Sequence, residues 1–214
     1  ILFLTAYTDA ETMQRVFSAG ADDYVSKPVV GPELVTRILN RLERSRILRN
    51  LLETDPLTGV ANRRKSTQDL VQRLEWSQQY QQPFCFAVLE VDQLKQINHQ
   101  YGHAAGDHVL LRIGKLLRQL FQSEDVVGRW GGTEFVIGMV GMTQQDGEQR
   151  IAEVLQGLRE TEFLSSVETS IRATCSVGIV ECFDSKMELQ ALYQAADLAL
   201  NQAKAAGGDR IVCL

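Results

Sequence analysis

The chain has 214 residues, 44% of them hydrophobic, and its 22 basic and 27 acidic side chains give a net charge of −5. This composition is typical of a globular protein of one or two domains, and the negative charge argues against a nucleic-acid-binding protein, which needs a basic face. No apolar run approaches the roughly 20 residues that cross a bilayer, and the four cysteines form no C-x-x-C pair. We therefore expect a cytoplasmic protein with reduced thiols and no membrane partner.

Residues 1–31 read as strand, helix, strand. The first four residues are an unbroken apolar run, which suits a strand buried on both faces. Asp9 can cap a helix that ends at Gly20, and residues 21–25 read as a second strand. Because two strands are too few for a stable sheet, we interpret the chain as a fragment whose first domain begins before residue 1.

Residues 32–54 read as one long helix with an apolar stripe that shifts phase near Ser45. The stripe consists of Leu34, Ile38, Leu42, Leu48, Leu51 and Leu52. Two interpretations stay open. Either the helix packs on its own domain, or it is a coiled-coil connector that also dimerises. The second is favoured because the stripe continues beyond the point where a small domain would stop.

Residues 55–214 read as one domain in which strands and helices follow the order β-α-β-β-α-β. This order predicts an α+β, palm-like fold: a mainly antiparallel sheet with helices on one side. Helical patterns cover 63–80, the stretch around 109–117, 147–160 and 188–206, and strand patterns cover 84–91, 126–130, 135–140, 171–183 and 211–214.

Polar side chains gather after the buried strand that ends near residue 91. Glu90 and Asp92 are two positions apart on a strand, so they point the same way and can share a hard cation such as Mg²⁺. Lys95 offers a point charge for a phosphate. Asn98 and Asp107 supply an amide and a carboxylate, which suit the edge of a guanine. A solvated strand end with ordinary caps is an equally open interpretation.

Three further places carry candidate chemistry. Gly131 and Gly132 stand in a hairpin, where glycines let a ligand approach the backbone and N–H groups can hold a phosphate; a plain hairpin turn is the alternative. Lys204 follows the pattern of a helix C-terminus, where its charge also complements the helix dipole. The segment 55–64 suits a tight turn and a helix cap, or simply a linker.

Several separate motifs in residues 55–214 together resemble the GGDEF family of diguanylate cyclases. The blocks that carry the resemblance are Asp55–Gly59 with Asn62–Arg64, Glu90–Asn98, Tyr101–His103 with Gly106–Asp107, Arg129–Phe135, Ser176–Ile179, and Ala195–Asp197 with Ala203–Lys204. The resemblance implies that two subunits, each holding one GTP, face each other and form cyclic di-GMP and pyrophosphate with Mg²⁺ or Mn²⁺.

The resemblance also assigns roles to individual residues. It implies that Asn98 and Asp107 read the guanine and that Lys95 and Lys204 contact the phosphates. Gly131 and Gly132 would form the turn beside the nucleotide. The metal ligands would be Glu90, the backbone carbonyl of Val91 and Glu134. Lys95 and Glu134 would also act in catalysis, together with position 133.

Residues 1–31 resemble the C-terminal part of a response-regulator receiver domain. By this resemblance Thr5 is the switch hydroxyl, Tyr24 the switch aromatic residue and Lys27 the lysine that meets the phosphoryl group. The peptide bond between Lys27 and Pro28 is usually cis in that family. The resemblance implies two-component phosphorelay signalling, with a cognate histidine kinase as the partner of the complete receiver.

Departures from the family pattern affect the predicted activity. Thr133 stands where the family has Asp or Glu. Its hydroxyl is neutral, with a pKa far above that of any useful base, so it cannot take up the proton that a carboxylate could. Glu90 replaces Asp, and Gly208 stands where the family has a phosphate-binding Arg. The family's Arg-x-x-Asp site, where the product binds and inhibits the enzyme, lacks its Arg here and keeps Asp125. We therefore expect a degenerate domain that serves as a GTP-binding, regulatory or dimerisation module. An active diguanylate cyclase is the main alternative, and another nucleotidyl cyclase is a third.

Overall fold

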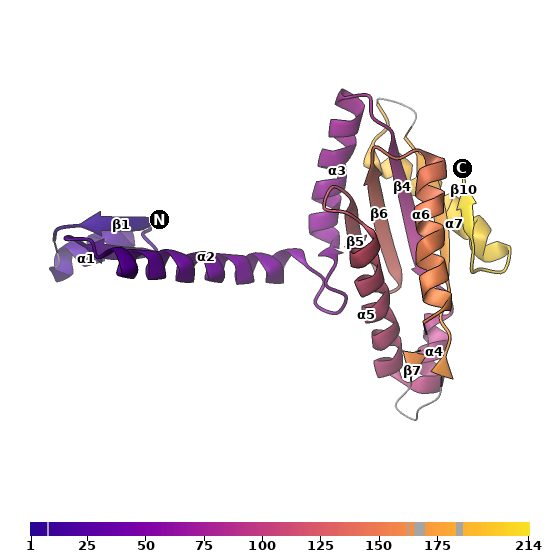
Figure 1. The fold of residues 1–214 in the computed structure, drawn as a ribbon, viewed down its shortest axis with the longest axis horizontal. Helices are drawn as coiled ribbons and strands as arrows, with labels where there is room; N and C mark the ends of the chain where they lie inside the picture. Colours follow the sequence, from indigo (N-terminus) through magenta and orange to yellow (C-terminus); the bar gives the residue numbers. More distant parts are fainter. Residues whose placement is uncertain (8, 162, 165–169, 183–185) are drawn as a thin grey trace. The chain divides into compact units, whose positions relative to one another are not determined.

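A computed structural model describes residues 1–7, 9–161, 163–164, 170–182 and 186–214. These residues form two compact units, Ile1–Leu52 and Glu53–Leu214, each of which is described by itself (Figure 1). In the described part of the chain, no helix combines the length and the hydropathy that a membrane crossing requires.

The first unit is a small β-α-β-α piece. It contains β1 (Leu2–Thr5), α1 (Ala10–Ser18), β2 (Asp23–Ser26) and most of α2 (Gly31–Glu53). The strands β1 and β2 are parallel, Asp9 caps α1 through Thr12, and the Lys27–Pro28 peptide is cis, as expected. The prediction that β1 is buried on both faces is wrong for this unit, because Phe3 is 38% and Leu4 49% exposed.

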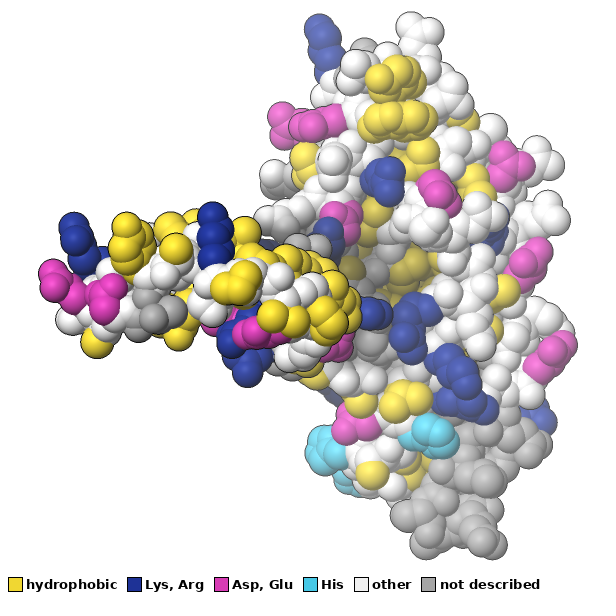
Figure 2. All heavy atoms as spheres, turned by 60° about the vertical axis from the view of Figure 1, so that its left-hand side comes forward, with side chains coloured by type: hydrophobic (Ala, Val, Ile, Leu, Met, Phe, Trp, Pro, Cys, Tyr) yellow, Lys and Arg dark blue, Asp and Glu magenta, His cyan; other side chains and the backbone are white. Residues whose placement is uncertain are grey.

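Apolar side chains remain exposed along α2. Those described are Val35, Ile38, Leu39, Leu42, Ile47, Leu48 and Leu52; the side chain of Leu51, part of the predicted stripe, lies outside the described residues. Figure 2 shows hydrophobic side chains on the surface of this unit. Arg37 pairs with Glu33 and Asp23 near the start of the helix. The described residues of the first unit thus leave most of the stripe uncovered.

A six-stranded mixed sheet organises the second unit, in the order β10-β9-β4-β6-β5-β3. The central pairings β9–β4, β4–β6 and β6–β5 are antiparallel, and the outer pairings β10–β9 and β3–β5 are parallel. The strands are β3 (Ala61–Asn62), β4 (Phe84–Val91), β5 (Val126–Arg129), β6 (Glu134–Val140), β9 (Cys175–Glu181) and β10 (Ile211–Cys213); a separate ribbon joins β7 (Phe163–Leu164) to β8 (Ser170–Ile171).

Helices cover both faces of this sheet, so the prediction of helices on one side is wrong (Figure 1). The reason lies in β4, whose residues 84–89 are all buried. Its even-numbered residues pack in one apolar cluster with α3 (Arg63–Gln79) and α7 (Leu189–Ala205). Its odd-numbered residues pack in another cluster with α4 (Leu94–Tyr101), α5 (His103–Leu120) and α6 (Gln144–Arg159).

Three local features differ from the predicted elements. The strand predicted over 171–183 is divided, because β8 ends at Ile171 and β9 begins at Cys175; position 183 lies outside the described residues. The sequence did not predict α4, because this short helix is mostly polar and buries only Leu94 and Ile97. Helix α6 begins before position 147, because Thr143 and Asp146 form a capping box.

Gly178 allows the close packing of α7 on β9. A Cβ atom at this position would lie 2.0 Å from the carbonyl oxygen of Ala196 and 2.4 Å from the amide nitrogen of Leu200. Both are backbone atoms, so no side-chain movement relieves the contact. This glycine therefore fixes how near α7, which carries the predicted phosphate contact Lys204, can approach the sheet.

Candidate active site

Two carboxylates, Glu90 and Glu134, lie side by side where β4 ends and β6 begins. They are direct cross-strand partners in the antiparallel pair, so their side chains leave the same face of the sheet. Lys204 Nζ lies 2.5 Å from Glu90 Oε2, and the hydroxyl of Tyr193 donates a hydrogen bond of 3.0 Å to Glu134 Oε1. Both partners come from α7, so one helix holds both carboxylates.

Burial is the main influence on the pKa of Glu134. It raises the pKa of this carboxyl, the Tyr193 hydrogen bond opposes it, and the nearby charges of Glu90 and Asp197 raise the pKa further. The net shift is upward. Burial and the charge of Glu134 in turn raise the pKa of Tyr193 to about 12. Close acidic groups of this kind favour the binding of a cation between them.

An aromatic stack supports Tyr193 from the glycine-turn side. The ring of Trp130, directly before the two glycines, stacks on Tyr193 with centroids 5.1 Å apart. The guanidinium of Arg63 lies 5.5 Å from the Trp130 ring centroid. The indole N–H of Trp130 donates to the hydroxyl of Ser66. The start of α3, the turn and α7 are therefore packed together behind Glu134.

Arg129 holds the glycine turn in place. Its guanidinium donates to the carbonyl oxygens of Gly132, at 2.7 Å, and Gly131, at 3.2 Å, and pairs with Asp55 at 3.0 Å. Burial raises the pKa of Asp55, but hydrogen bonds from Thr58 and Arg129 outweigh this effect and hold that pKa below its ordinary value. The first motif of the domain therefore acts as an anchor for the turn.

The backbone itself does not require the two glycines of the turn. Neither has a positive φ. A Cβ atom on Gly132 would meet nothing within 4 Å, and one on Gly131 would lie 3.6 Å from the nearest atom. Space for a ligand beside the turn is therefore a better reason for glycine here than local geometry. Thr133 follows, and its carbonyl oxygen accepts a hydrogen bond from the amide of Val91.

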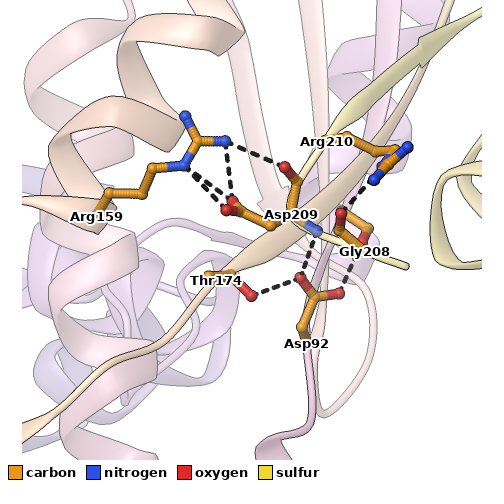
Figure 3. A network of polar contacts seen from close by, with 7 residues as sticks. Asp92, Arg159, Thr174, Gly208, Asp209 and Arg210 are labelled. Atoms are coloured by element: carbon orange, nitrogen blue, oxygen red, sulfur yellow. Dashed lines mark hydrogen bonds and ion pairs between the residues drawn. The ribbon is translucent and has the colours of Figure 1, made fainter. Parts of the chain in front are cut away.

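Asp92 has a structural role, and its share in a cation site with Glu90 stays a prediction. Its carboxylate accepts hydrogen bonds from the hydroxyls of Thr174, at 2.8 Å, and Ser176, at 2.7 Å, and from the amide of Asp209, at 3.1 Å. Arg159 of α6 binds Asp209 from the other side (Figure 3). Asp92 therefore fastens the turn that follows α7 to the end of β4.

Asp92→Ala is expected to lower the free energy of unfolding by about 2 kcal/mol, because two hydroxyls and an amide lose their acceptor. Chemical denaturation measures this loss, and hydrogen exchange at Gly207 and Gly208 should rise because the turn is released. Asp69→Ala is the control, since Asp69 pairs with Lys65 on the surface of α3 and should cost under about 1 kcal/mol. Equal unfolding midpoints for Asp92→Ala and the wild type would show that the network carries no stability.

The predicted guanine readers lie on neighbouring helices. Asn98 is on α4, and its Oδ1 atom is buried without a hydrogen-bond partner among the described residues. That atom lies against Gly106 of α5, where a Cβ would approach it to 1.9 Å. Asp107 is the next residue and is exposed, as is Lys95, one turn before Asn98. A buried acceptor without a partner is costly unless a ligand supplies the donor.

A cavity of about 640 Å³ opens beside the strand-end carboxylates. Glu90, Val91, Lys204, Gly207 and Gly208 line part of it. Lys95, Asn98 and Asp107 are not among its lining residues. The structure thus places Glu90, Val91 and Lys204 at this cavity. It leaves the predicted phosphate contact Lys95, the predicted metal ligand Glu134 and the two predicted guanine readers outside the cavity lining.

Asp125, the acid that matches the family's Arg-x-x-Asp pattern, is used inside the fold. Its side chain is 3% exposed and pairs with Arg150 of α6 at 2.9 Å, and it also accepts from the amide of Gln122. Burial raises the pKa of Asp125, although the charge of Arg150 opposes the rise. This carboxylate is therefore already committed to a contact within the domain.

The predicted receiver residues lie on and just after the two strands of the first unit. The amide of Lys27 donates to the carbonyl oxygen of Thr5, and the Thr5 hydroxyl accepts from the amide of Tyr7. The ring of Tyr24 meets that of Phe17 edge-on. Their role in a phosphorelay stays a prediction.

Sequence reasoning missed Tyr193 and Arg172. Tyr193 precedes Lys204 by 204 − 193 = 11 positions, about three helical turns, so the two share a face of α7, and this spacing was a usable signal. Arg172 lines the same cavity as Lys204, but the sequence around it gave no signal.

Comparisons with known proteins agree with these motifs. The model of the family described as "Diguanylate cyclase, GGDEF domain" matches residues 52–210. Diguanylate cyclase DgcP of Pseudomonas aeruginosa is 35% identical over 158 residues, which cover 74% of this chain and 23% of that protein. Response regulator PleD of Caulobacter vibrioides is 27% identical over 223 residues, which cover 99% of this chain and 49% of that protein.

Solved structures agree as well. A microbial GGDEF domain described with bound cyclic di-GMP is 33% identical, with a TM-score of 0.68 over 78% of this chain and 99% of that one. The coiled coil and GGDEF domain of DgcB from Caulobacter crescentus has a TM-score of 0.79 at 21% identity, over 86% of this chain and 96% of that one, which shows the fold alone. This chain spans between 23% and 58% of the length of the first curated relatives that it matches.

Proposed function

The chain belongs to the GGDEF family of diguanylate cyclase domains, and on that premise we propose that it is a degenerate member that binds GTP and works as a regulatory or dimerisation module of cyclic di-GMP signalling. The observation that carries the proposal is Thr133, a neutral side chain next to Glu134 at the end of a strand pair that otherwise presents carboxylates.

Features for nucleotide binding are retained. The buried Oδ1 atom of Asn98 awaits a donor, and the N–H groups on a guanine edge supply one. Asp107 follows Gly106, which lies against that atom, and its exposed carboxylate can accept from the same kind of edge. Gly131 and Gly132 leave room beside the turn. Nothing in the fold described here requires this combination, which supports a ligand as its reason.

The residues at the strand ends fit a divalent cation, with a reduced donor set. Glu90, Glu134 and the backbone carbonyl of Val91 would hold Mg²⁺ or Mn²⁺, which suits oxygen ligands. Such an ion neutralises phosphate charge and makes a bound hydroxyl more acidic. Among the described residues, however, no three acidic, His or Cys side chains are arranged to hold a metal. Loss of one carboxylate at such a site removes several kcal/mol of transition-state stabilisation, about 10²–10⁵ in rate.

An active diguanylate cyclase is the second candidate. Its support is that relatives 35% and 31% identical to this chain are named diguanylate cyclases, and that Glu90 and Glu134 keep two of the carboxylates. This candidate requires that the hydroxyl of Thr133 serves in place of the missing acid.

The first unit supplies the proposed input. Its β-α-β-α order and the match of nearly the whole chain to a response regulator support a receiver that a histidine kinase phosphorylates. The exposed stripe on α2 supports a connector through which two copies dimerise.

Calorimetry with GTP and ATP in Mg²⁺ tests the binding part of this proposal. The wild type should bind GTP and discriminate against ATP, and Asp107→Ala should weaken GTP binding by about 1–3 kcal/mol, because the guanine edge loses its acceptor. Glu153→Ala, which removes an exposed carboxylate from α6, should leave the affinity for GTP unchanged. Equal affinities for GTP and ATP would rule out a guanine pocket.

A further inference from the structure

Arg172 is an uncommitted cation in the cavity beside Glu90. It lies between β8 and β9, is exposed, and lines the cavity together with Lys204. The other charged lining residues are satisfied: Glu90 pairs with Lys204, and Asp92 accepts from Thr174, among others. No hydrogen bond or ion pair joins the Arg172 side chain to another described residue. Its charge is therefore available to a ligand.

The start of α4 and one face of that helix add neutral donors to the same cavity. Gln93, Gln96 and Gln100 all line it. Gln93 directly precedes α4, and the spacing of four positions places Gln96 and Gln100 on one side of the helix. Their side-chain amides make no hydrogen bond to a described residue. A guanidinium with several free amides is a donor set for a ligand rich in acceptor oxygens, such as a chain of phosphates.

Position 208, in the turn after α7, is poorly suited to a long cationic side chain. Gly208 lines it, but its φ is +76°, and a Cβ there would lie 3.3 Å from both Asp92 Oδ2 and Ser176 Oγ. A longer side chain at this position is strained whatever its charge. Arg172 brings a guanidinium into the same cavity from the loop before β9 instead.

We propose that Arg172, supported by the amides of Gln93, Gln96 and Gln100, binds the terminal phosphates of the nucleoside triphosphate. The proposal rests on the GTP binding proposed above. The position of the cavity favours the phosphates over the base, because Glu90 and Lys204 line it and Asn98 and Asp107 do not. A guanidinium can contact two phosphate oxygens at once.

Calorimetry in Mg²⁺ with GTP, GMP and inorganic pyrophosphate tests this assignment. Arg172→Gln should weaken GTP and pyrophosphate binding about tenfold or more, the effect of a lost charge-assisted hydrogen bond. Binding of GMP, which lacks the terminal phosphates, should not change. Arg172→Lys keeps the charge but loses the planar guanidinium that contacts two oxygens at once. Its affinities for GTP and pyrophosphate should therefore lie between those of the wild type and Arg172→Gln. Arg112→Gln removes the same side chain from the exposed face of α5, outside the cavity lining, and should match the wild type.

The outcomes separate this inference from the proposed function. If the wild type binds GTP and Arg172→Gln binds it equally well, the Arg172 assignment is wrong and the guanine site stands. If the wild type fails to bind GTP but binds pyrophosphate through Arg172, the guanine proposal is wrong and the phosphate site stands. If the wild type binds neither, both fail. Because Arg172 is exposed, matched melting curves of the variants suffice to exclude misfolding.

Discussion

Thr133→Asp is expected to raise the rate of cyclic di-GMP formation at least about a hundredfold, the lower end of the effect of restoring one charged ligand at such a site. Thr133 directly precedes Glu134, and its carbonyl oxygen accepts a hydrogen bond from the amide of Val91, the residue after Glu90. We therefore expect a carboxylate at position 133 to lie near those two acids. Thr133→Asn is the matched control, because it has the same shape without the charge. The measurement is cyclic di-GMP yield from GTP and Mg²⁺ at equal dimer concentration.

The same variant has a signature in stability. Burial and neighbouring acids already raise the pKa of Glu134, so a further carboxylate should cost about 1 kcal/mol without metal, through repulsion between like charges. Mg²⁺ should reverse that loss in the Asp variant and leave Thr133→Asn unchanged. Adding Glu90→Asp should increase the activity further, because it restores the shorter ligand of the family. Gly208→Arg should not help, because a side chain is strained at φ +76°.

Two results would count against this account of Thr133. An Asp variant no faster than the Asn control, although both bind GTP with Mg²⁺ and dimerise, would place the block elsewhere. A metal-free melting temperature that rises in the Asp variant would show that position 133 does not face Glu134 and Glu90.

Arg150→Met is expected to lower the free energy of unfolding by about 3–5 kcal/mol, because it leaves the buried carboxylate of Asp125 without its cation. The pair is largely enclosed, with side-chain exposures of 20% for Arg150 and 3% for Asp125. The double variant with Asp125→Asn should recover much of the loss. Arg159→Met is the control, because its pair with Asp209 is exposed, and it should cost no more than about 1 kcal/mol.

The pH dependence of the Arg150→Met variant has a definite sign. Burial raises the pKa of Asp125 in the folded state, and loss of Arg150 should raise it further. The folded form then holds the proton more tightly than the unfolded form, so the variant gains stability as the pH falls through the folded pKa and loses it as the pH rises. Denaturation midpoints at several pH values measure this. A deficit that stays constant with pH would mean that lost packing, rather than the unpaired charge, is the cause.

The sequence was most informative where local patterns decide the structure. The apolar run in 84–91 became β4 with the predicted bounds, because a strand covered on both faces needs apolar residues throughout. That same run implied a layer on each face, yet the predicted layout placed helices on one side. Short polar elements such as α4 were missed because tertiary contacts, rather than periodicity, stabilise them.

Contacts between residues far apart in the sequence limited how much of the candidate site could be predicted. The spacing of Glu90 and Asp92 predicted a common direction, but it could not show that Asp92 accepts hydrogen bonds from Thr174 and Ser176, 82 and 84 positions later. Asp125 likewise finds Arg150 25 positions away. Such partners depend on which strands and helices become neighbours, and no local pattern encodes that.

Turnover of GTP by the unmodified protein tests the central claim most directly. The dimeric wild-type chain is incubated with GTP and Mg²⁺ or Mn²⁺, bound GTP is measured by calorimetry, and pyrophosphate and cyclic di-GMP are followed beside Thr133→Asp. Our account predicts that the wild type binds GTP and forms product at least about a hundredfold more slowly than the variant. A wild type that binds GTP and forms cyclic di-GMP as fast as Thr133→Asp would contradict it.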